Sequence, residues 1–264
     1  MDENSKKLID KFHIISRKGW IKATDKGWGG IGLTFEHEIG KEPDSKYLPD
    51  FDDIEIKCSS RYSRYPMYLF AIAFDSNENE IIRLASKYGY NDPDYPDKKV
   101  LFRKVDNAII AGNKYNFFFK VDRTNKIIRL QVFSNDGDLL DDSAYITFEN
   151  LKKHFETKLK KIACINASKK IDNEIIYYRY YHLSLYNSKS FNTFLELIER
   201  NMLVINLVAR VGKCGADKGR YKNKGVVFAI RKDNLKRLFE QYYEYNYDFK
   251  KKFKNLNYNF IPFK

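Results

Sequence analysis

Two hydrophobic periods interleave along the whole chain, and this constrains the fold more than any other feature of the sequence. Apolar residues spaced by three or four positions, as at Leu8, Phe12 and Ile15, predict an amphipathic helix over 5–20. Strict alternation in Asp53-Ile54-Glu55-Ile56-Lys57 predicts a strand. Further helices are predicted over 33–39, 149–160, 191–201 and from Asp233, and further strands over 67–74, 115–121, 127–133, 139–148, 162–166, 203–211 and 226–231. No repeat and no long linker interrupts this pattern, so we expect one α/β chain over 1–264.

Length and composition exclude several classes of protein. With 264 residues, 43% hydrophobic and 31% charged, the chain is neither disordered nor fibrous. It has no apolar stretch of about 20 residues and no secretory signal, so we expect no membrane contact. Cys58, Cys164 and Cys214 are widely spaced and odd in number, which argues against both a zinc site and a disulfide framework. These features favour the cytoplasm.

The formal net charge of +13 is unevenly distributed. Residues 203–264 hold 15 Lys and Arg against 5 Asp and Glu, whereas the segment 36–55 holds eight acidic residues and two lysines. A basic excess favours a polyanionic partner such as nucleic acid, although AT-rich coding produces a similar composition. An acidic cluster within a basic chain indicates a divalent metal site, because hard cations prefer oxygen ligands.

Part of the acidic segment has the form P-D-x4-E-x-K, with Asp50, Glu55 and Lys57 as its chemical groups. Phosphodiester hydrolysis requires a metal that polarises the phosphoryl group, which two carboxylates can hold, and a lysine that orients water or stabilises developing charge. Strand alternation places Glu55 and Lys57 on one face. The pattern alone also fits a solvated strand face, and Asp53 competes with Asp50 because it shares the Glu55 and Lys57 face.

An ordered series of motifs carries a family resemblance. It comprises Gly19-Trp20, Thr24, Lys26-Gly27, Gly30-Ile31-Gly32, Thr34-Phe35-Glu36, Pro49-Asp50-Phe51, Asp53 to Lys57, Tyr115-Asn116, Phe118 to Asp122, Arg129-Leu130, Val132-Phe133, Lys158 to Lys160, Ile162-Ala163 and Tyr177-Tyr178. This series resembles type II restriction endonucleases of the MvaI/BcnI group, which are related to the strand nickase MutH within the PD-(D/E)xK nuclease superfamily.

The resemblance implies a fold and a set of roles. The fold would be a PD-(D/E)xK core, with a central mixed sheet flanked by helices, in a bilobal molecule with a DNA-binding cleft. Asp50 and Glu55 would bind Mg2+, with Mn2+ as a substitute, Lys57 would assist the attacking water, and Glu36 would be the auxiliary acid. We expect a catalytic lobe over roughly 1–165 and a recognition lobe over roughly 166–264.

Candidate DNA-binding residues lie mainly in a glycine- and lysine-rich loop predicted over 212–225. They are Arg61, Arg64, Arg210, Lys213, Lys218, Arg220, Lys222 and Lys224. Arginine pairs with guanine, lysine contacts guanine or phosphate, and glycine lets the backbone approach DNA; a solvated hairpin is the alternative. Arg210 resembles a base-reading arginine of the family, but Val208 replaces an aspartate, and Lys222 and Lys224 replace histidines, so we expect different base reading. Tyr242, Tyr243, Tyr245 and Tyr247 fit base stacking or the edge of a core.

The leading hypothesis is a Mg2+-dependent restriction endonuclease that cuts double-stranded DNA at a short sequence and leaves 5′-phosphate ends. It would act as a monomer beside a companion DNA methyltransferase that is not a physical partner. One alternative is a MutH-like nickase that depends on repair partners. Another is a DNA-binding protein with an inactive nuclease site.

Overall fold

The computed structural model describes residues 1–27, 29–41, 48–60 and 63–249. By contact, the chain forms two compact units from interleaved segments. Unit 1 comprises Met1–Ser63, Lys161–Tyr186 and Gln241–Lys264, and unit 2 comprises Arg64–Lys160 and Asn187–Glu240. The catalytic lobe predicted over roughly 1–165 and the recognition lobe predicted over roughly 166–264 are defined by role and not by contact, so they stay predictions. By contact, residues 161–186 group with the N-terminal segment because they pair with its strand.

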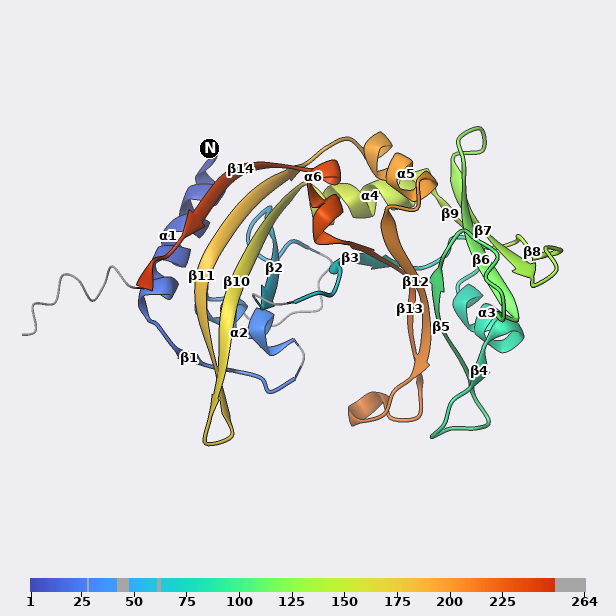
Figure 1. The fold of residues 1–264 in the computed structure, drawn as a ribbon, viewed down its shortest axis with the longest axis horizontal. Coiled ribbons are helices and arrows are strands. Elements are labelled where there is room, and N and C mark those ends of the chain that lie inside the picture. Colours follow the sequence, from blue (N-terminus) through green and yellow to red (C-terminus); the bar gives the residue numbers. More distant parts are fainter. Residues whose placement is uncertain (28, 42–47, 61–62, 250–264) are drawn as a thin grey trace, which may run out of the picture. The chain divides into compact units, whose positions relative to one another are not determined.

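Unit 1 is organised around a mixed five-stranded sheet. Its elements are α1 (Glu3–Arg17), β1 (Ile21–Lys22), α2 (Gly30–Glu38), β2 (Glu55–Ser60), β10 (Lys161–Asp172), β11 (Ile175–Ser188) and β14 (Phe239–Asn246). The strand order is β1-β11-β10-β2, with β14 also paired to β11 (Figure 1). Strand β2 runs parallel to β10, with Glu55 opposite Ile162 and Lys57 opposite Cys164. The predicted central mixed sheet is therefore present.

The core of unit 1 forms where α1 and α2 pack on one face of this sheet. Asp2 caps α1 by accepting a hydrogen bond from the backbone N–H of Ser5 at 3.0 Å. Phe12 and Phe35 are fully buried, in one cluster with Tyr180 of β11. The tyrosines of β14 (Tyr242, Tyr243 and Tyr245) pack against the same cluster. These three tyrosines therefore complete the edge of a core, which was the alternative to base stacking in the sequence prediction.

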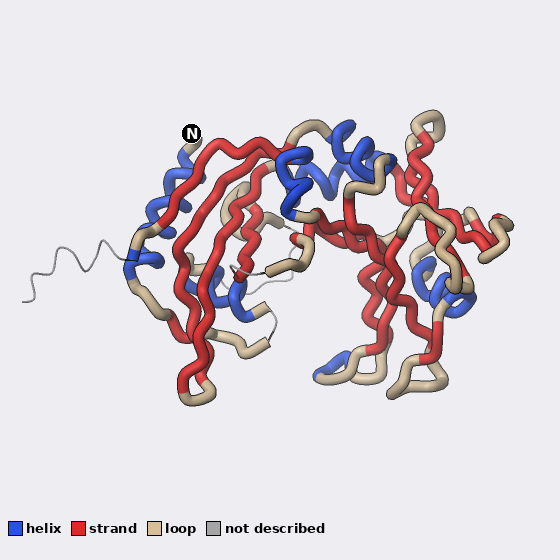
Figure 2. The backbone as a smooth tube through the Cα atoms, in the orientation of Figure 1, coloured by secondary structure: helices blue, strands red, loops and turns tan. Residues whose placement is uncertain are grey.

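Among the described residues, unit 2 contains two antiparallel sheets and four α-helices. Its elements are β3 (Met67–Ile72), α3 (Glu80–Tyr88), β4 (Tyr90–Asn91), β5 (Lys99–Val105), β6 (Tyr115–Asp122), β7 (Ile127–Ser134), β8 (Leu139–Asp141), β9 (Tyr145–Thr147), α4 (Phe148–Leu159), α5 (Phe191–Glu199), β12 (Leu203–Val211), β13 (Tyr221–Ile230) and α6 (Leu235–Leu238). One sheet has the order β3-β13-β12-β5-β4, and the other has the order β6-β7-β8 with β9 beside β7. Figure 2 shows β12 and β13 as a long hairpin that ends in a loop.

Aromatic packing joins helices α4 and α5 of unit 2 to its larger sheet. Phe70 of β3, Phe194 of α5 and Phe228 of β13 are buried, with ring centroids 5.2–5.8 Å apart. Phe155 of α4 joins them through Phe194, at a centroid distance of 5.4 Å. Burial of large rings in such offset and tilted arrangements is a major source of stability.

Three local predictions for unit 2 need correction. Residues 221–224, expected in a loop, begin β13, because pairing with β12 satisfies their backbone while polar side chains stay exposed. The helix expected from Asp233 is a 3-10 turn followed by the single turn α6, since the chain must return to a strand at Phe239. The strand expected over 139–148 is split into β8 and β9, and Thr147 caps α4 there by accepting from the Asn150 N–H at 3.3 Å.

The weakly patterned segment 75–112 contains α3, β4 and β5. No helix in the described ranges is long and apolar enough to cross a membrane.

Candidate active site

A tight turn delivers the chain into β2. The backbone of Phe51 and Ile54 is joined by two hydrogen bonds of 3.0 and 2.8 Å, and Asp52 adopts a positive φ of 49° between them. Strand pairing then begins at Glu55, which is only 6% exposed. An acidic side chain this buried requires partners. Glu55 therefore does not lie on a solvated strand face.

Opposite charges meet on this strand and at its entrance. The Lys57 ammonium lies 2.8 Å from Glu55 Oε1, and the Lys41 ammonium lies 3.0 Å from Asp50 Oδ1. The other oxygen of Asp50 accepts a hydrogen bond from the Ile56 N–H at 3.0 Å. This bond ties Asp50, which precedes the turn, to the strand that carries Glu55 and Lys57. We call Glu36, Asp50 and Glu55, with Lys41 and Lys57, the carboxylate cluster.

Glu36 joins the cluster from helix α2. That helix starts at Gly30, where a Cβ atom would lie 2.3 Å from the Asp25 carbonyl oxygen, so only glycine fits. Partial burial raises the pKa of Glu36, and the negative charges of Asp50 and Glu55 raise it further. Glu36 therefore interacts electrostatically with Asp50 and Glu55 within unit 1.

Asp53 belongs to a different set of contacts. It lies in the turn before β2, 2.6 Å from the Lys161 ammonium, and accepts a hydrogen bond from Asn4 at 2.9 Å. Burial by itself would raise the pKa of Asp53, but the hydrogen bonds from Lys161 and Asn4 outweigh it and lower the pKa. Of the two competing aspartates, Asp50 is the one bonded to β2 beside Glu55.

The donor set of the cluster suits a hard divalent cation. Its three carboxylates and two ammonium groups leave one negative charge in excess, in a largely buried region. Within the described residues, no three His, Cys, Asp or Glu side chains are arranged to enclose a metal by themselves. Mg2+ needs no such enclosure, because it keeps several waters and is commonly held by one or two carboxylates plus phosphate oxygens. Asp50 and Glu55 fit that requirement.

Several predicted DNA-binding cations meet on the β12–β13 hairpin. Arg210 is paired in register with Lys222, and a bulge inserts Lys224 beside them. Gly225 makes the bulge possible, with φ of +70° and a position where a Cβ would lie 2.3 Å from the Ile72 carbonyl oxygen. We call Arg210, Lys222 and Lys224 the cationic face.

The cationic face keeps a net positive charge. The pKa of Lys224 is lowered by partial desolvation of its ammonium group and by the charges of Arg210 and Lys222. Asp217 lies 2.8 Å from the Lys222 ammonium and balances one of the three charges. An anion that binds beside Lys224 would stabilise the charged form of its ammonium group.

The remaining predicted DNA-binding residues are placed differently. Lys218 and Arg220 are exposed in the hairpin loop, and Arg64 is exposed before β3. Lys213 is ion-paired to Asp92 and Asp94 of another loop. Arg61 lies outside the described residues.

Sequence reasoning missed Lys41 as a partner of Asp50, and Asp92 as a partner of Lys213. Lys41 comes three residues after the end of α2, and its backbone N–H donates to the Glu36 carbonyl oxygen at 2.9 Å. That bond turns the chain so that the Lys41 side chain reaches Asp50. The only signal in the sequence was that Lys41 is one of two lysines in the acidic segment 36–55. That position did not indicate which carboxylate it would contact.

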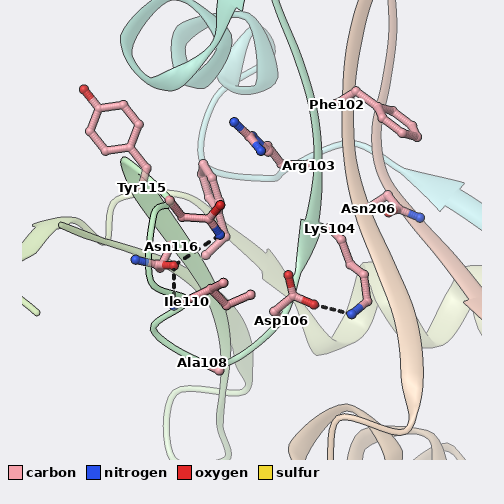
Figure 3. Close-up of a pocket in the computed structure, with 11 residues that line it drawn as sticks. Phe102, Arg103, Lys104, Asp106, Ala108, Ile110, Tyr115, Asn116 and Asn206 are labelled. Atoms are coloured by element: carbon pink, nitrogen blue, oxygen red, sulfur yellow. Dashed lines mark hydrogen bonds and ion pairs between the residues drawn. The ribbon is translucent and has the colours of Figure 1, made fainter. Parts of the chain in front are cut away.

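A pocket with a volume of about 320 Å3 lies within unit 2, and Figure 3 shows residues that line it. Phe102, Lys104 and Asn206 line it from β5 and β12, and Asn116 lines it from β6. Asn116 is buried and accepts a hydrogen bond from the Ile110 N–H at 2.9 Å, so it holds the loop before β6. The pocket contains none of the predicted catalytic residues.

Strand β2 of a mixed sheet carries a glutamate and a lysine, an aspartate from the segment before it is bonded to that strand, and a helical glutamate interacts with them. This arrangement is consistent with a nuclease core of the PD-(D/E)xK class. The family model described as "MvaI/BcnI restriction endonuclease family" matches residues 9–239. The chain belongs to this family. It is a type II restriction endonuclease, a site-specific deoxyribonuclease.

Solved structures agree with the assignment. The chain is similar to a structure described as "Restriction endonuclease MvaI-cognate DNA substrate complex", with 28% sequence identity, a TM-score of 0.84, and coverage of 92% of this chain and 98% of that one. A structure described as "Restriction endonuclease MvaI in the absence of DNA" has the same identity and coverage, with a TM-score of 0.58. Comparison with curated protein sequences gives no match.

Proposed function

We propose that this restriction endonuclease hydrolyses phosphodiester bonds of double-stranded DNA at a short specific sequence, using Mg2+ or Mn2+, and leaves 5′-phosphate ends. The observation that carries the proposal is the carboxylate cluster, in which Asp50, Glu55 and Lys57 converge on one strand of the sheet. The similar MvaI structure is a complex with a cognate DNA substrate, which supports DNA as the substrate here.

Each residue of the cluster has a role that follows from its chemistry. Asp50 and Glu55 would hold the metal ion, which when bound polarises the scissile phosphate and lowers the pKa of water. Lys57, 2.8 Å from Glu55, orients the attacking water and stabilises negative charge that develops on the phosphate. Glu36, whose pKa is raised, adds a third carboxylate that hydrogen-bonds water at the site.

DNA recognition belongs to the cationic face in this proposal. Arg210 can donate two hydrogen bonds to guanine, and Lys222 and Lys224 contact guanine or phosphate. Lys218, Arg220, Arg61 and Arg64 add contacts to the DNA backbone. The one excess acidic charge of the carboxylate cluster and the net positive charge of this face fit the two tasks of holding a cation and holding a polyanion.

The proposal includes a biological setting. We place the enzyme in the cytoplasm as a monomer, where a companion methyltransferase protects the host sites without binding the enzyme. A monomer has one carboxylate cluster, so it would cut the two strands in succession.

A plasmid incubation tests the activity directly. Supercoiled plasmid is incubated with the purified chain, with and without Mg2+, and the ends of a cleaved genomic library are sequenced. Linear product that requires Mg2+, with one recurrent short sequence at its 5′-phosphate ends, is expected. Product that stops at the nicked circle would support a MutH-like nickase, and unchanged plasmid at every metal concentration would overturn the proposal.

A further inference from the structure

One acidic side chain in unit 2 is buried although it lies in a loop. Asp92, between β4 and β5, is 4% exposed. Its Oδ1 accepts hydrogen bonds from the N–H groups of Asp94 and Tyr95, at 2.9 and 3.2 Å, and so shapes its own loop. The same oxygen is bonded to the Lys213 ammonium from the β12–β13 hairpin loop. A single carboxylate therefore joins two loops that are 121 residues apart in sequence.

Further contacts join the same two loops. The Lys213 ammonium also lies 2.8 Å from Asp94 and 5.2 Å from the centre of the Tyr95 ring. From the other direction, the Lys98 ammonium donates to the Gly219 carbonyl oxygen and lies 5.6 Å from the Tyr95 ring centre. Tyr95 is thus approached by one lysine from each loop. We call the contacts among Asp92, Asp94, Tyr95, Lys98, Lys213 and Gly219 the loop clasp.

The hairpin loop needs such an anchor. Residues 213–218 and 220 are exposed. Backbone hydrogen bonds of 2.9–3.1 Å within residues 212–220 shape the loop locally, whereas the loop clasp ties it to the neighbouring loop of unit 2. Ordering an exposed loop costs conformational entropy. When the loop is already held before the ligand arrives, binding does not incur that cost, and a rigid loop adapts less to a wrong ligand.

We propose that Asp92 and Lys213 are positioning residues that hold the hairpin loop in the conformation that reads DNA. The inference rests on the proposed function of the hairpin in DNA recognition. It assigns Lys213 to Asp92 and Asp94 instead of to a DNA phosphate. The acidic loop over 92–98 thereby becomes part of the apparatus for sequence discrimination, through the hairpin and without touching the bases.

Hydrogen exchange of the free protein tests the clasp without DNA. Asp92→Asn keeps the acceptor for the Asp94 and Tyr95 N–H groups and removes only the charge, while Lys213→Met keeps the aliphatic stem. Both substitutions should raise the exchange rate at residues 213–220 at least tenfold, with no change at β7. The matched control is Asp97→Asn, which removes an exposed acid from the same loop and should change neither region. Unchanged exchange at 213–220 in both variants would overturn the clasp.

Cleavage assays test its role in discrimination. The rate at the enzyme's own target is divided by the rate at sites with one base changed, with active-enzyme concentration measured by titration. This ratio should fall at least tenfold in both Asp92→Asn and Lys213→Met. The double variant should be no worse than either single one, because both remove the same contact.

Two results would overturn the role in discrimination. One is an equal loss of rate at every site, which would indicate a general loss of structure. The other is a salt dependence of DNA binding that weakens by about one ion for Lys213→Met alone, which would make Lys213 a phosphate contact.

The two proposals fail separately. A wild-type protein that cuts no DNA defeats the proposed function, and hydrogen exchange then still decides whether the clasp holds the loop. If Asp92→Asn does not fold, Lys98→Met removes the opposite half of the clasp and carries the same expectation for residues 213–220.

Discussion

The carboxylate cluster of unit 1 and the cationic face of unit 2 handle charge differently. In the cluster, Glu55 and Asp50 each have a lysine within 3.0 Å, and all four side chains are 8–17% exposed. On the cationic face, three like charges lie together with one acidic partner, on exposed residues. Buried charges need partners inside the protein, whereas exposed charges can stay unpaired until a charged ligand arrives.

The paired, buried charges of the carboxylate cluster suit catalysis, whereas the exposed, unbalanced charges of the cationic face suit binding. A reacting group must be held at a fixed position before the substrate arrives, which internal ion pairs and the Ile56 N–H bond achieve. A binding surface needs charge that attracts and can release counterions. The comparison therefore predicts that substitutions in the cluster affect the rate of cleavage, whereas those on the cationic face affect DNA affinity.

The largest expected effect is that of Asp50→Asn. It keeps the acceptor for the Ile56 N–H but loses the charge of a metal ligand, so cleavage should fall about 10²- to 10³-fold while DNA binding is retained. The control is Asp53→Asn, the same change three residues later, which should stay within about twofold. Single-turnover rates and gel-shift titrations measure both quantities. Equal losses in the two variants would remove the distinction between Asp50 and Asp53.

Arg210→Ala should have the next largest effect, on binding. Loss of a bidentate base contact costs about 1–3 kcal/mol, which corresponds to an increase in Kd of roughly 5- to 150-fold. Arg123→Ala removes the same type of charge from unit 2 where the arginine is paired with Glu199 at 2.9 Å, and should change Kd by less than about twofold. Fluorescence anisotropy with a labelled target duplex gives both values. Equal weakening would mean that only net charge matters.

Glu36→Gln should reduce cleavage about tenfold, the range typical of groups that support a metal site. Helix α2 supplies a control two residues away, since Glu38 is ion-paired to Lys18 at 2.6 Å, outside the cluster. Glu38→Gln should leave the rate unchanged. A titration of Mg2+ against rate would show a weaker apparent metal affinity for Glu36→Gln only. The same response in both variants would contradict the role of Glu36.

The smallest functional effect should come from Asp141→Asn, in a charge network without a proposed role in cleavage. Arg83 lies 2.7 Å from Asp141, which is 6% exposed. Burial would raise the pKa of Asp141, but hydrogen bonds from Arg83 and Ser143 outweigh it and hold the pKa far below its usual range. Breaking this partly exposed pair should lower the free energy of unfolding by about 1–3 kcal/mol at neutral pH.

The pH dependence of that loss has a definite sign. Because the folded pKa of Asp141 lies below the unfolded one, the stabilisation is complete above about pH 5 and decreases as the pH falls below about 4. The stability difference between wild type and Asp141→Asn, measured by urea unfolding, should therefore shrink in acid. Asp142→Asn, at an exposed neighbour, should show no such difference. A cleavage defect in Asp141→Asn would show that paired charge outside the cluster also serves catalysis.

Local patterns predicted much of this structure. Hydrophobic periods identified α1, α5 and the strands β3, β6, β7 and β12, because such a period acts between residues near in sequence. The spacing of Asp50, Glu55 and Lys57 indicated which groups could meet on one strand. The alternation of polar and apolar residues did not show that β2 begins only at Glu55. Asp53 therefore lies in the turn before the strand, where it contacts Lys161.

Polar segments were harder to predict. The lysine- and glycine-rich residues 221–224 had the composition of a loop, yet their backbone pairs with β12. Whether such a segment becomes a strand depends on the partner strand that its backbone finds, and not on its own side chains. The same holds for the bulge at Lys224, which places that residue beside Arg210.

The amino-acid sequence by itself determined the types of element, the acidic and basic segments, and the family to which their motifs point. Only the tertiary structure decided which charges are paired, as with Lys41 and Asp50, or Lys213 and Asp92. The physical reason is that helical and strand periods are properties of a local segment, whereas an ion pair depends on where the fold brings two distant segments together. The Lys213 and Asp92 pair spans 121 residues, and no local pattern specifies it.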